Sequence, residues 1–545
     1  MSKVAQYLQE HLVGEVMTSV DARRYFATDS SIFSLPPALV VYPRSENDVR
    51  KTARFTWQLA ERGRVIPMTS RGSGTDQTGA ALGTGIVIVF PAHMHRILEL
   101  DTKANTVTVE PGINYGKLQQ TLHTHHRFLP PFPASMEYST VGGAVANNAS
   151  GEKSVKYGDT RNFVTSLRVV LANGEVIETS RLSKRDLNKK LGLASFEGEI
   201  YRQLDTLLEE NKPLVSKTLR NVTRNNAGYH LIDVLRGDGS FDLTPLFLGS
   251  QGTLGIITEI SLDTEAYNPS TTLLLASFDS LEQTQAAVLA LRALPDVPSA
   301  IELVDGHLLD LVQARNPNLL REVMPQPFPT AVLLVEFDNA NERSLKRAVR
   351  RANKIFEQYA SSLHTETDPE RQNNFWKIRQ ASSTLLANNE GHDRAVPLID
   401  DATIPPDQIK NYMQAVYALL EKNNLPIAVW GHAGDGTFRV QPALNLSLVG
   451  DRQTAFRLMD EYYKLVISLG GTVSGERNDG RLRAPYAELQ YGPEVTALFR
   501  KVKQIFDPYG TLNPGVKVGV SLDDIRALVR PDYSLDHLYD HLPRS

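Results

Sequence analysis

The chain has 545 residues, of which 41% are hydrophobic and 22% are charged, and its net charge is −4 at pH 7. These values are typical of a globular protein with about three structural units, and they indicate no nucleic-acid partner. No apolar run approaches the roughly 20 residues of a membrane span, and the N-terminus lacks the apolar core of a secretory signal. We expect a cytoplasmic protein without a transmembrane segment, and peripheral attachment at the inner face of a membrane stays open.

Cysteine is absent from the sequence. The chain therefore has no disulfides, thiol nucleophiles, thiolate zinc sites or iron–sulfur clusters of its own. Any redox chemistry needs a bound organic cofactor, a metal held by histidine and carboxylate side chains, or both.

Helix and strand patterns alternate from the N-terminus to about Thr264. A short amphipathic helix comes first, and a second helix follows an N-cap candidate at Ser45 or Asn47. Strand patterns appear in "RVIPMTS", "IVIVF" and "NTVTVEPG", and "NYGKLQQTLHTHH" has helical spacing. This part of the chain therefore predicts an α+β region of about 230 residues.

After Tyr267 the pattern changes to a regular succession of strands and helices. Strands are expected in "STTLLLASF", "AIELVD" and "TAVLLVEF", and long helices at 280–294 and 342–360. This succession predicts a second α/β layer that runs to about Arg477. The chain then becomes rich in turns as far as Gly519, and the charged last stretch is expected on the surface.

The segment "RGSGTDQTG" at residues 71–79 follows a strand, as the fingerprint of a dinucleotide-binding protein does. Its glycines, Gly72, Gly74 and Gly79, do not have the Rossmann spacing, and a strand follows instead of a helix. The segment is therefore either a loop whose exposed N–H groups bind an anion or a plain tight turn.

Two further segments are rich in small residues, "STVGGAVANNASG" at 139–151 and "GSQGTLGIIT" at 249–258. Tight turns alone do not explain three such loops in one region. Glycine allows a backbone to approach a ligand closely. Together the loops predict a long ligand with backbone wrapped around it, such as a dinucleotide with a pyrophosphate centre.

The order of these motifs resembles that of a known family, the flavin-dependent oxidases and dehydrogenases of the vanillyl-alcohol-oxidase type, which have a PCMH-type FAD-binding domain. Within it the chain is most similar to the branch of D-lactate, D-2-hydroxyglutarate and glycolate dehydrogenases. The motifs are "PRSENDV" at Pro43, "RGSGTDQTG" at Arg71, "EPG" at Glu110, "PPFPAS" at Pro130, "STVGGAVANNASG" at Ser139, "YGD" at Tyr157, "GSQGTLGIIT" at Gly249, "GHAGDG" at Gly431, "SGE" at Ser474 and "FDPYGTLNPG" at Phe506.

The resemblance implies an α+β fold, in which a PCMH-type FAD-binding domain of two subdomains meets an α/β, ferredoxin-like cap. A C-terminal segment returns to the FAD-binding domain. The expected segments are an N-terminal helical segment at 1–34, the FAD-binding domain at 35–267, the cap at 268–476, the return at 477–520 and a surface tail at 521–545.

The resemblance also implies where FAD binds. Covalently tethered relatives carry a histidine or cysteine at the linkage, and this chain has no cysteine and no histidine in its first glycine-rich loop. We therefore expect FAD to be bound non-covalently. The expected cofactor contacts are Arg71, Gly72, Ser73, Gly74, Thr75, Asp76, Gly79, Ser139, Thr140, Val141, Gly142, Gly143, Asn148, Ala149, Ser150, Gly151, Gly252, Gly255, Ile256, Ile257 and Asn513.

This sequence departs from the family pattern at the residues that, in the relatives, lie around the substrate. In the metal-dependent relatives two histidines and a glutamate bind a divalent cation, and a third histidine takes the proton of the substrate hydroxyl. Here His432 and Glu476 remain, whereas Arg439 and Arg477 stand where the other two histidines are expected. Arginine has no lone pair for a metal, so we expect no metal. His432 and Glu476 would be its remaining ligands if one were kept.

Two interpretations follow from the arginines. In one, Arg439 and Arg477 bind a substrate carboxylate and stabilise a developing alkoxide, with His432 as the general base. In the other, the protein no longer oxidises a substrate, and it keeps FAD to stabilise its structure or to pass electrons on. Arg379 in "FWKIRQ" is a further carboxylate-binding candidate by resemblance, and its alternative is an arginine on a helix surface.

The function that the resemblance implies is oxidation of a small D-2-hydroxy acid by hydride transfer to flavin N5. No nicotinamide fingerprint is present, so electrons are expected to leave to a quinone-linked or iron–sulfur protein that is a separate chain. The alternatives are a non-catalytic or divergent electron-transfer subunit that binds FAD, and a sugar or polyol oxidase of the same superfamily.

Overall fold

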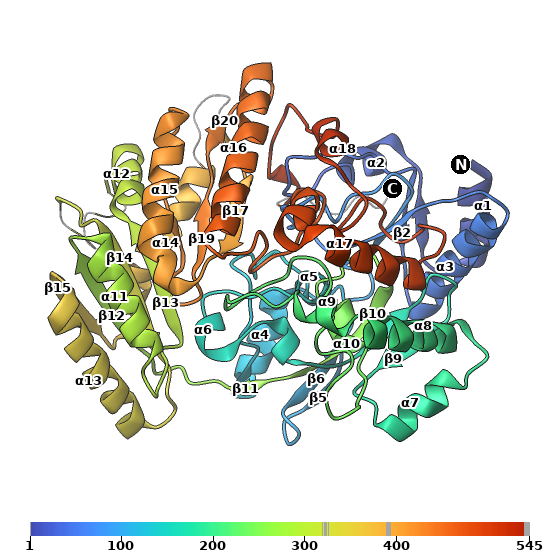
Figure 1. Ribbon diagram of the computed structural model, residues 1–545, viewed down its shortest axis with the longest axis horizontal. Coiled ribbons are helices and arrows are strands. Elements are labelled where there is room, and N and C mark those ends of the chain that lie inside the picture. The colour runs from blue at the N-terminus through green and yellow to red at the C-terminus, as the bar shows by residue number, and fades with distance from the viewer. Residues whose placement is uncertain (1, 319, 321–323, 325, 388–393, 539–545) are drawn as a thin grey trace.

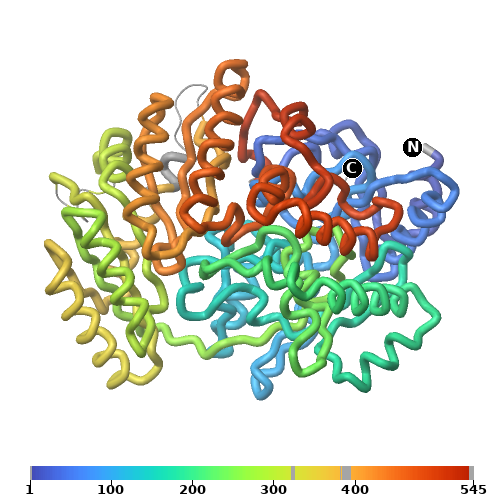
Figure 2. The backbone as a smooth tube through the Cα atoms, in the orientation of Figure 1, coloured from blue at the N-terminus to red at the C-terminus, as the bar shows by residue number. Residues whose placement is uncertain are grey.

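The computed structural model describes residues 2–318, 320, 324, 326–387 and 394–538. Figures 1 and 2 show two lobes side by side. The first lobe, which we call the N-terminal domain, combines the N-terminal half of the chain with the C-terminal segment, drawn blue to green and red. The second, which we call the cap, is the yellow-green to orange part from β12 to α16.

The first subdomain of the N-terminal domain has a sheet of four strands, three parallel and one antiparallel. Its order is β1 (Glu15–Met17), β2 (Leu39–Tyr42), β4 (Ile86–Val89) and β3 (Met68–Arg71). Side chains alternate along β2, so Leu39 and Val41 pack with α1 (Ser2–His11) and α3 (Glu46–Glu61), and Val40 and Tyr42 form a core on the other face beside α2 (Val20–Tyr25). Because both faces are covered, the central strands are apolar throughout.

The second subdomain has an antiparallel sheet of five strands. Its order is β5 (Ile97–Asp101), β6 (Thr106–Val109), β10 (Ile256–Asp263), β8 (Val164–Val170) and β9 (Val176–Thr179). Residues of α4 (Tyr115–Thr124), α8 (Phe196–Glu210) and α17 (Ala487–Phe506) share one apolar core with this sheet. Shorter elements complete the lobe: β7 (Arg127–Phe128), α5 (Val141–Asn147), α6 (Ser154–Tyr157), α7 (Lys184–Leu191), α9 (Lys212–Ser216), α10 (Thr244–Phe247) and β11 (Glu265–Ala266).

The cap is built on an antiparallel sheet of seven strands. Its order is β15 (Ser362–Glu366), β12 (Thr272–Phe278), β14 (Ala331–Phe337), β13 (Ala300–Asp305), β18 (Trp430–His432), β19 (Thr437–Val440) and β17 (Ile399–Thr403). The first four have the ferredoxin-like order, with one extra helix, α12 (Gly306–Arg315), between β13 and β14. The expected ferredoxin-like cap is thus confirmed, and β18, β19 and β17 extend it.

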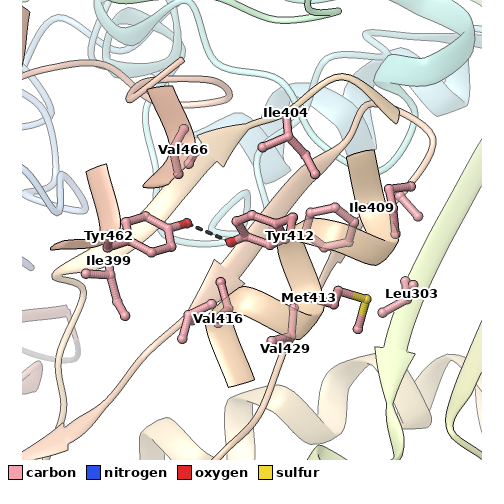
Figure 3. Packing of buried hydrophobic residues seen from close by; sticks show 14 of the residues in the cluster. Leu303, Ile399, Ile404, Ile409, Tyr412, Met413, Val416, Val429, Tyr462 and Val466 are labelled. Atoms are coloured by element: carbon pink, nitrogen blue, oxygen red, sulfur yellow. Dashed lines mark hydrogen bonds between the residues drawn. The ribbon is translucent and has the colours of Figure 1, made fainter. Parts of the chain in front are cut away.

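Helices cover both faces of the cap sheet. On one face lie α11 (Leu281–Arg292), α13 (Glu342–Tyr359), α15 (Ile409–Lys422) and α16 (Val449–Ser468), and on the other α12 and α14 (Pro369–Ala387). Figure 3 shows the larger core, where Tyr412 of α15 and Tyr462 of α16 share a hydrogen bond of 2.7 Å between their hydroxyls. This contact satisfies two buried polar groups that would otherwise destabilise an apolar core. The pair β16 (Arg394–Ala395) and β20 (Ala443–Leu444) lies beside the sheet.

The chain returns to the first subdomain after α17. Leu512 pairs with Met68 of β3 in a parallel bridge. The next residue, Asn513, is buried; its amide donates to the carbonyls of Ala80 at 2.8 Å and Gln251 at 2.7 Å. The return thus joins two of the three loops predicted to wrap a ligand.

The predicted surface tail, described as far as residue 538, is mostly exposed or partly exposed, but a few of its side chains anchor it to the N-terminal domain. After α18 (Leu522–Arg526), Val529 forms a bridge with Phe33, and Arg530 donates to two carbonyls of the segment 29–31. Ile525, Arg530, Tyr533 and His537 are all buried. Because the segment is highly charged, its sequence did not predict these few buried positions. Among the described helices, none is both long and apolar enough to cross a membrane.

Candidate cofactor and substrate site

An elongated cavity lies where the two subdomains meet, at the end of β3 and the start of α5. The cavity is divided into two parts that share Ser70, Gly72, Thr140, Gly143 and Gly252 in their walls. Of the predicted cofactor contacts, the structure places these in the cavity wall: Arg71, Gly72, Ser73, Gly74, Thr75, Asp76, Ser139, Thr140, Gly142, Gly143, Ala149, Gly252, Gly255 and Ile257. One end of the cavity reaches Glu476 and Arg477 of the predicted substrate end.

Backbone lines much of this cavity because glycine stands where a side chain would collide. Gly74 has φ +78°, and a Cβ there would lie 2.4 Å from a guanidinium nitrogen of Arg71. A Cβ at Gly142 would lie 2.6 Å from Pro111. Helix α5 begins beside the cavity, and its N-cap Thr140 accepts a hydrogen bond from the N–H of Gly143 at 3.1 Å. The start of a helix offers N–H groups and partial positive charge to an anion.

Arg71 is the strongest sign of an anionic ligand. Its side chain is 2% exposed, and none of its three guanidinium nitrogens has a hydrogen-bond partner within the described chain. Burial lowers its pKa, opposed by the nearby Asp29 carboxylate. A buried guanidinium without a partner is unfavourable, and the phosphates of a dinucleotide would satisfy it. The residues present therefore fit a dinucleotide such as FAD.

The remaining predicted cofactor contacts, all within the described chain, are not part of the cavity wall: Gly79, Val141, Asn148, Ser150, Gly151, Ile256 and Asn513. Asn148 illustrates what they do. It ends α5 with φ 51°, and its amide donates to Asp159 at 2.9 Å and Asn226 at 2.8 Å. Asn148 and Asn513 hold the loops in place from within the protein.

Beside the cavity end that Glu476 and Arg477 line, charged side chains from both lobes meet on strands β13, β18, β19 and β17 of the cap sheet and on α14. We call this group the charged band. Its members are Glu302, Arg379, Asp400, His432, Arg439, Glu476 and Arg477, which include every predicted catalytic residue. Two of its acids, Glu302 and Asp400, were not among the predicted site residues. Each stands in an apolar strand, in "AIELVD" and "PLIDDATI", where an acid needs a partner.

His432 lies between two carboxylates. Its Nδ1 is 2.6 Å from Oε1 of Glu302, and its Nε2 is 3.1 Å from Oε2 of Glu476. Burial lowers the pKa of His432, but the two carboxylates outweigh burial and raise it to about 9. With a carboxylate oxygen at each ring nitrogen, the site favours the imidazolium form, which donates from both nitrogens and has no lone pair. The geometry does not support the prediction that His432 is the general base.

Every predicted arginine of the band is bound to an acid. Arg379 Nε donates to Glu302 at 2.7 Å, and Arg439 donates to Glu476 at 2.5 Å. Arg477 donates to Asp400 at 2.6 Å and also contacts Gln77. Burial raises the pKa of Glu476, but Arg439 and His432 outweigh it and hold that pKa well below its usual range.

Asp401 shapes the segment that carries Glu476 and Arg477, and the sequence did not single it out. It adopts φ +72°, which is rare for a residue other than glycine. Its carboxylate accepts the backbone N–H groups of Glu476 at 2.9 Å and Arg477 at 3.0 Å. Asp401 thereby fixes the turn that places Arg477 at the cavity.

The band does not have the form of a metal site. His432 and Glu476, the two remaining family ligands, are hydrogen-bonded to each other, and Arg439 also donates a hydrogen bond to Glu476. Among the residues that the structure describes, no group of three or more histidine, aspartate or glutamate side chains is arranged to hold a metal. The expectation that no metal binds remains a prediction.

Comparison with known proteins agrees with this geometry. Residues 37–180 match a family model described as an FAD binding domain, and residues 268–516 match the C-terminal domain of FAD linked oxidases. The chain belongs to the FAD-linked oxidases of the vanillyl-alcohol-oxidase, or PCMH, superfamily. FAD is the cofactor that its first domain defines; its non-covalent attachment remains a prediction.

Several curated relatives are dehydrogenases or oxidases of hydroxy acids. The chain is 31% identical to the D-2-hydroxyglutarate dehydrogenase of Escherichia coli (strain K12) over 93% of its own length and 50% of that protein. It is 28% identical to the glycolate oxidase subunit GlcD of Bacillus subtilis (strain 168), over 88% of this chain and 89% of that protein. The chain spans about half the length of the curated D-2-hydroxyglutarate dehydrogenases that it matches.

Solved structures support the fold. The chain resembles a p-cresol methylhydroxylase with a TM-score of 0.68 at 14% identity, covering 96% of this chain and 97% of the other. It resembles the 4-ethylphenol oxidase of Gulosibacter chungangensis with a TM-score of 0.66 at 14% identity, covering 96% and 98%. At this identity the likeness concerns the fold alone, and it confirms the predicted FAD-binding domain with a cap.

Proposed function

We propose that the protein is an FAD-dependent dehydrogenase of a small 2-hydroxy acid, of D configuration as in the name of the Escherichia coli relative. One observation carries this proposal: the charged band brings four cations to the end of the cofactor cavity, and one of them, Arg477, lines the cavity itself. The four cations are Arg379, His432, Arg439 and Arg477, and the three carboxylates are Glu302, Asp400 and Glu476. Because a guanidinium in the cavity wall matches a carboxylate in charge and in its planar, two-pronged geometry, this group favours an anionic substrate with a carboxylate.

The arginines would bind and orient this carboxylate. Arg477 lines the cavity, as Glu476 does, and it also contacts Gln77 of the first glycine-rich loop. A guanidinium has five N–H donors, so Arg477 can keep Asp400 and still bind a substrate. Arg439 is fixed by Glu476, and His432 keeps that acid in place from the other side. The positive charge that they hold would also stabilise the alkoxide character of the reacting hydroxyl.

When bound, FAD supplies the hydride acceptor. The walls of the cavity exclude water from the reacting carbon, because Pro133, Ala146 and Ala149 line it with apolar groups. We propose that the electrons then leave to a separate iron–sulfur or quinone-linked protein. A cytoplasmic location, with attachment at the inner face of the membrane as its variant, belongs to the same proposal.

Anaerobic mixing of the purified protein with D- and L-2-hydroxy acids tests the function, with loss of the oxidised flavin absorbance as the readout. Sugars and polyols, which lack a carboxylate, are the matched controls. We expect bleaching by one or more D-2-hydroxy acids and none by the controls. Bleaching by sugars alone would favour the polyol oxidase. If no compound bleaches the flavin, a non-catalytic electron-transfer subunit is favoured. Arg439 and Arg477, which stand where the relatives have histidines, are compatible with that alternative.

A further inference from the structure

A 2-hydroxy acid loses a hydroxyl proton when it is oxidised, and the charged band offers no clear acceptor for it. His432 has both ring nitrogens in hydrogen bonds to acids. Arginine does not act as a base at neutral pH. Glu302 and Glu476 each hold two cations, Glu302 with His432 and Arg379, and Glu476 with His432 and Arg439. Asp400 binds Arg477 and Gln441. Burial raises the pKa of Asp400, but the arginines around it outweigh burial and lower that pKa, which makes Asp400 a weak base.

Resting on the proposed function, we propose that the carboxylate of Glu152 accepts the hydroxyl proton of the substrate. Glu152 directly follows the loop 139–151, whose Ala149 lines the cofactor cavity. The two residues that follow Glu152 in the chain contact the cap. Lys153 forms an ion pair with Glu336, and Ser154 donates to Asp435 in the turn after His432.

The strand register brings Glu152 close to the band. In β13 and β14, Ala300 lies opposite Glu336 and Glu302 lies opposite Leu334. Side chains alternate along strands, so Glu302 and Glu336 project from the same face of the cap sheet. Lys153 binds Glu336 on that face, so its neighbour Glu152 joins the cofactor loop to the face of the cap sheet that carries Glu302.

Glu152 differs from the other acids of this region in having no hydrogen bond or ion pair of its own within the described chain. The charged groups that act on it are Lys153, Glu302, Glu336 and Arg379. Both cations already form ion pairs with other acids, Lys153 with Glu336 and Arg379 with Glu302. Burial, followed by repulsion from Glu302, therefore raises the pKa of Glu152, whereas the pKa of Glu302 is lowered. A carboxylate with a raised pKa is a better base near neutral pH.

The step balances with groups already named. The α-hydrogen leaves the substrate carbon with its electron pair and passes to FAD as a hydride. The hydroxyl O–H bond breaks, its proton goes to the Glu152 carboxylate, and the carbon–oxygen single bond becomes a carbonyl. The products are a 2-oxo acid, reduced cofactor and neutral Glu152. The side chain is only half-buried, so solvent can take this proton before the next substrate binds.

The test compares Glu152→Gln with wild type, with Glu488→Gln as the matched control because Glu488 is exposed on α17. Glutamine has the same shape and cannot take a proton. We expect Glu152→Gln to keep its FAD and to reduce it about 10²-fold or more slowly with a D-2-hydroxy acid. We expect Glu152→Asp to recover part of the rate, and the control to match wild type. Wild-type reduction should slow at low pH with a single ionisation above the usual range of glutamate.

A second readout does not depend on turnover. The 2-oxo acid product, followed through its perturbation of the flavin spectrum, should bind wild type more tightly as the pH falls, because protonated Glu152 donates to the keto oxygen. The amide of Glu152→Gln donates at every pH, so its binding should not change with pH. Reduction of Glu152→Gln as fast as an active wild type, or pH-independent wild-type reduction, overturns the inference alone. A wild type that no 2-hydroxy acid reduces overturns the proposed function, and this inference with it.

Discussion

Arg439 and Glu476 form a buried ion pair, with 2.5 Å between the guanidinium NH2 and Oε2. Glu476 is a residue that the family resemblance assigns to a metal, and Arg439 stands where a second histidine ligand is expected. The guanidinium thus takes the glutamate oxygen that a cation would take. The positive charge is retained, but it is now covalently part of the chain and cannot act as a Lewis acid.

We expect Arg439→His to bind a divalent metal. The change gives His432, Glu476 and the new imidazole, and three protein ligands are the usual number for a catalytic zinc. Elemental analysis after extensive dialysis should show roughly one zinc or manganese per chain in the variant and none in wild type. Arg439→Gln, which removes the charge without supplying a good ligand, is the control. Metal in wild type would contradict our view of the band, and metal-free Arg439→His would show that Arg439 is not what excludes it.

We expect Gly74→Val to yield colourless protein. At φ +78° a β-branched residue is strained, and its Cβ would collide with Arg71 at 2.4 Å. Gly450→Val is the matched control, because nothing lies within 4 Å of a Cβ there. Absorbance measures bound FAD and circular dichroism measures folding. In wild type, acid precipitation should release the FAD into the supernatant; flavin retained in the pellet would contradict non-covalent binding.

The cofactor cavity was predictable from sequence because its determinants are local. Gly74 and Gly142 stand in short segments where backbone approaches backbone, and the small-residue pattern is visible without a fold. The ferredoxin-like cap was also predictable, since each strand and helix of β12 to β15 has its own periodicity.

The charged band was only partly predictable because its pairs come from distant parts of the chain. Glu302 and His432 are 130 positions apart, and strand pairing alone brings them together. Without Glu302, the sequence gives no reason for the raised pKa of His432, and a histidine beside glycines resembles a free base. The inward contacts of the tail were not predicted for a similar reason: they depend on Phe33 and the segment 29–31, some 500 positions earlier.

We expect Arg477→Ala to weaken substrate binding more than it slows flavin reduction. Hydrogen bonds to a charged partner contribute about 1.5–3 kcal/mol each, which corresponds to a factor of roughly ten or more in affinity. The concentration of 2-hydroxy acid at half-maximal reduction rate should rise by about that factor. Arg477→Lys, which keeps the charge and loses the planar fork, should lie in between. The exposed Arg500→Ala is the control. An unchanged half-saturating concentration would place the carboxylate elsewhere.

Finally, we expect the free energy of unfolding to fall as the pH rises from about 6.5 to about 9, and His432 to cause part of this fall. Its pKa is about 9 in the folded protein, whereas 6.5 is ordinary for a histidine exposed in the unfolded chain. The folded state therefore holds the proton more tightly. This contribution is complete below pH 6.5, and it is lost as the pH rises through the folded value. A difference of this size corresponds to roughly 3 kcal/mol at most.

Urea unfolding of wild type and His432→Gln between pH 6 and 10 measures this contribution. Asp29, whose pKa burial raises to about 7, also titrates in this range, so the difference between the two proteins is the informative quantity. We expect His432→Gln to be less stable than wild type at pH 6 and to approach it by pH 10, because glutamine cannot supply the charge between Glu302 and Glu476. If the difference in the free energy of unfolding between the two proteins stays constant over this range, His432 is neutral in the folded protein. His432 would then again be a candidate for the general base.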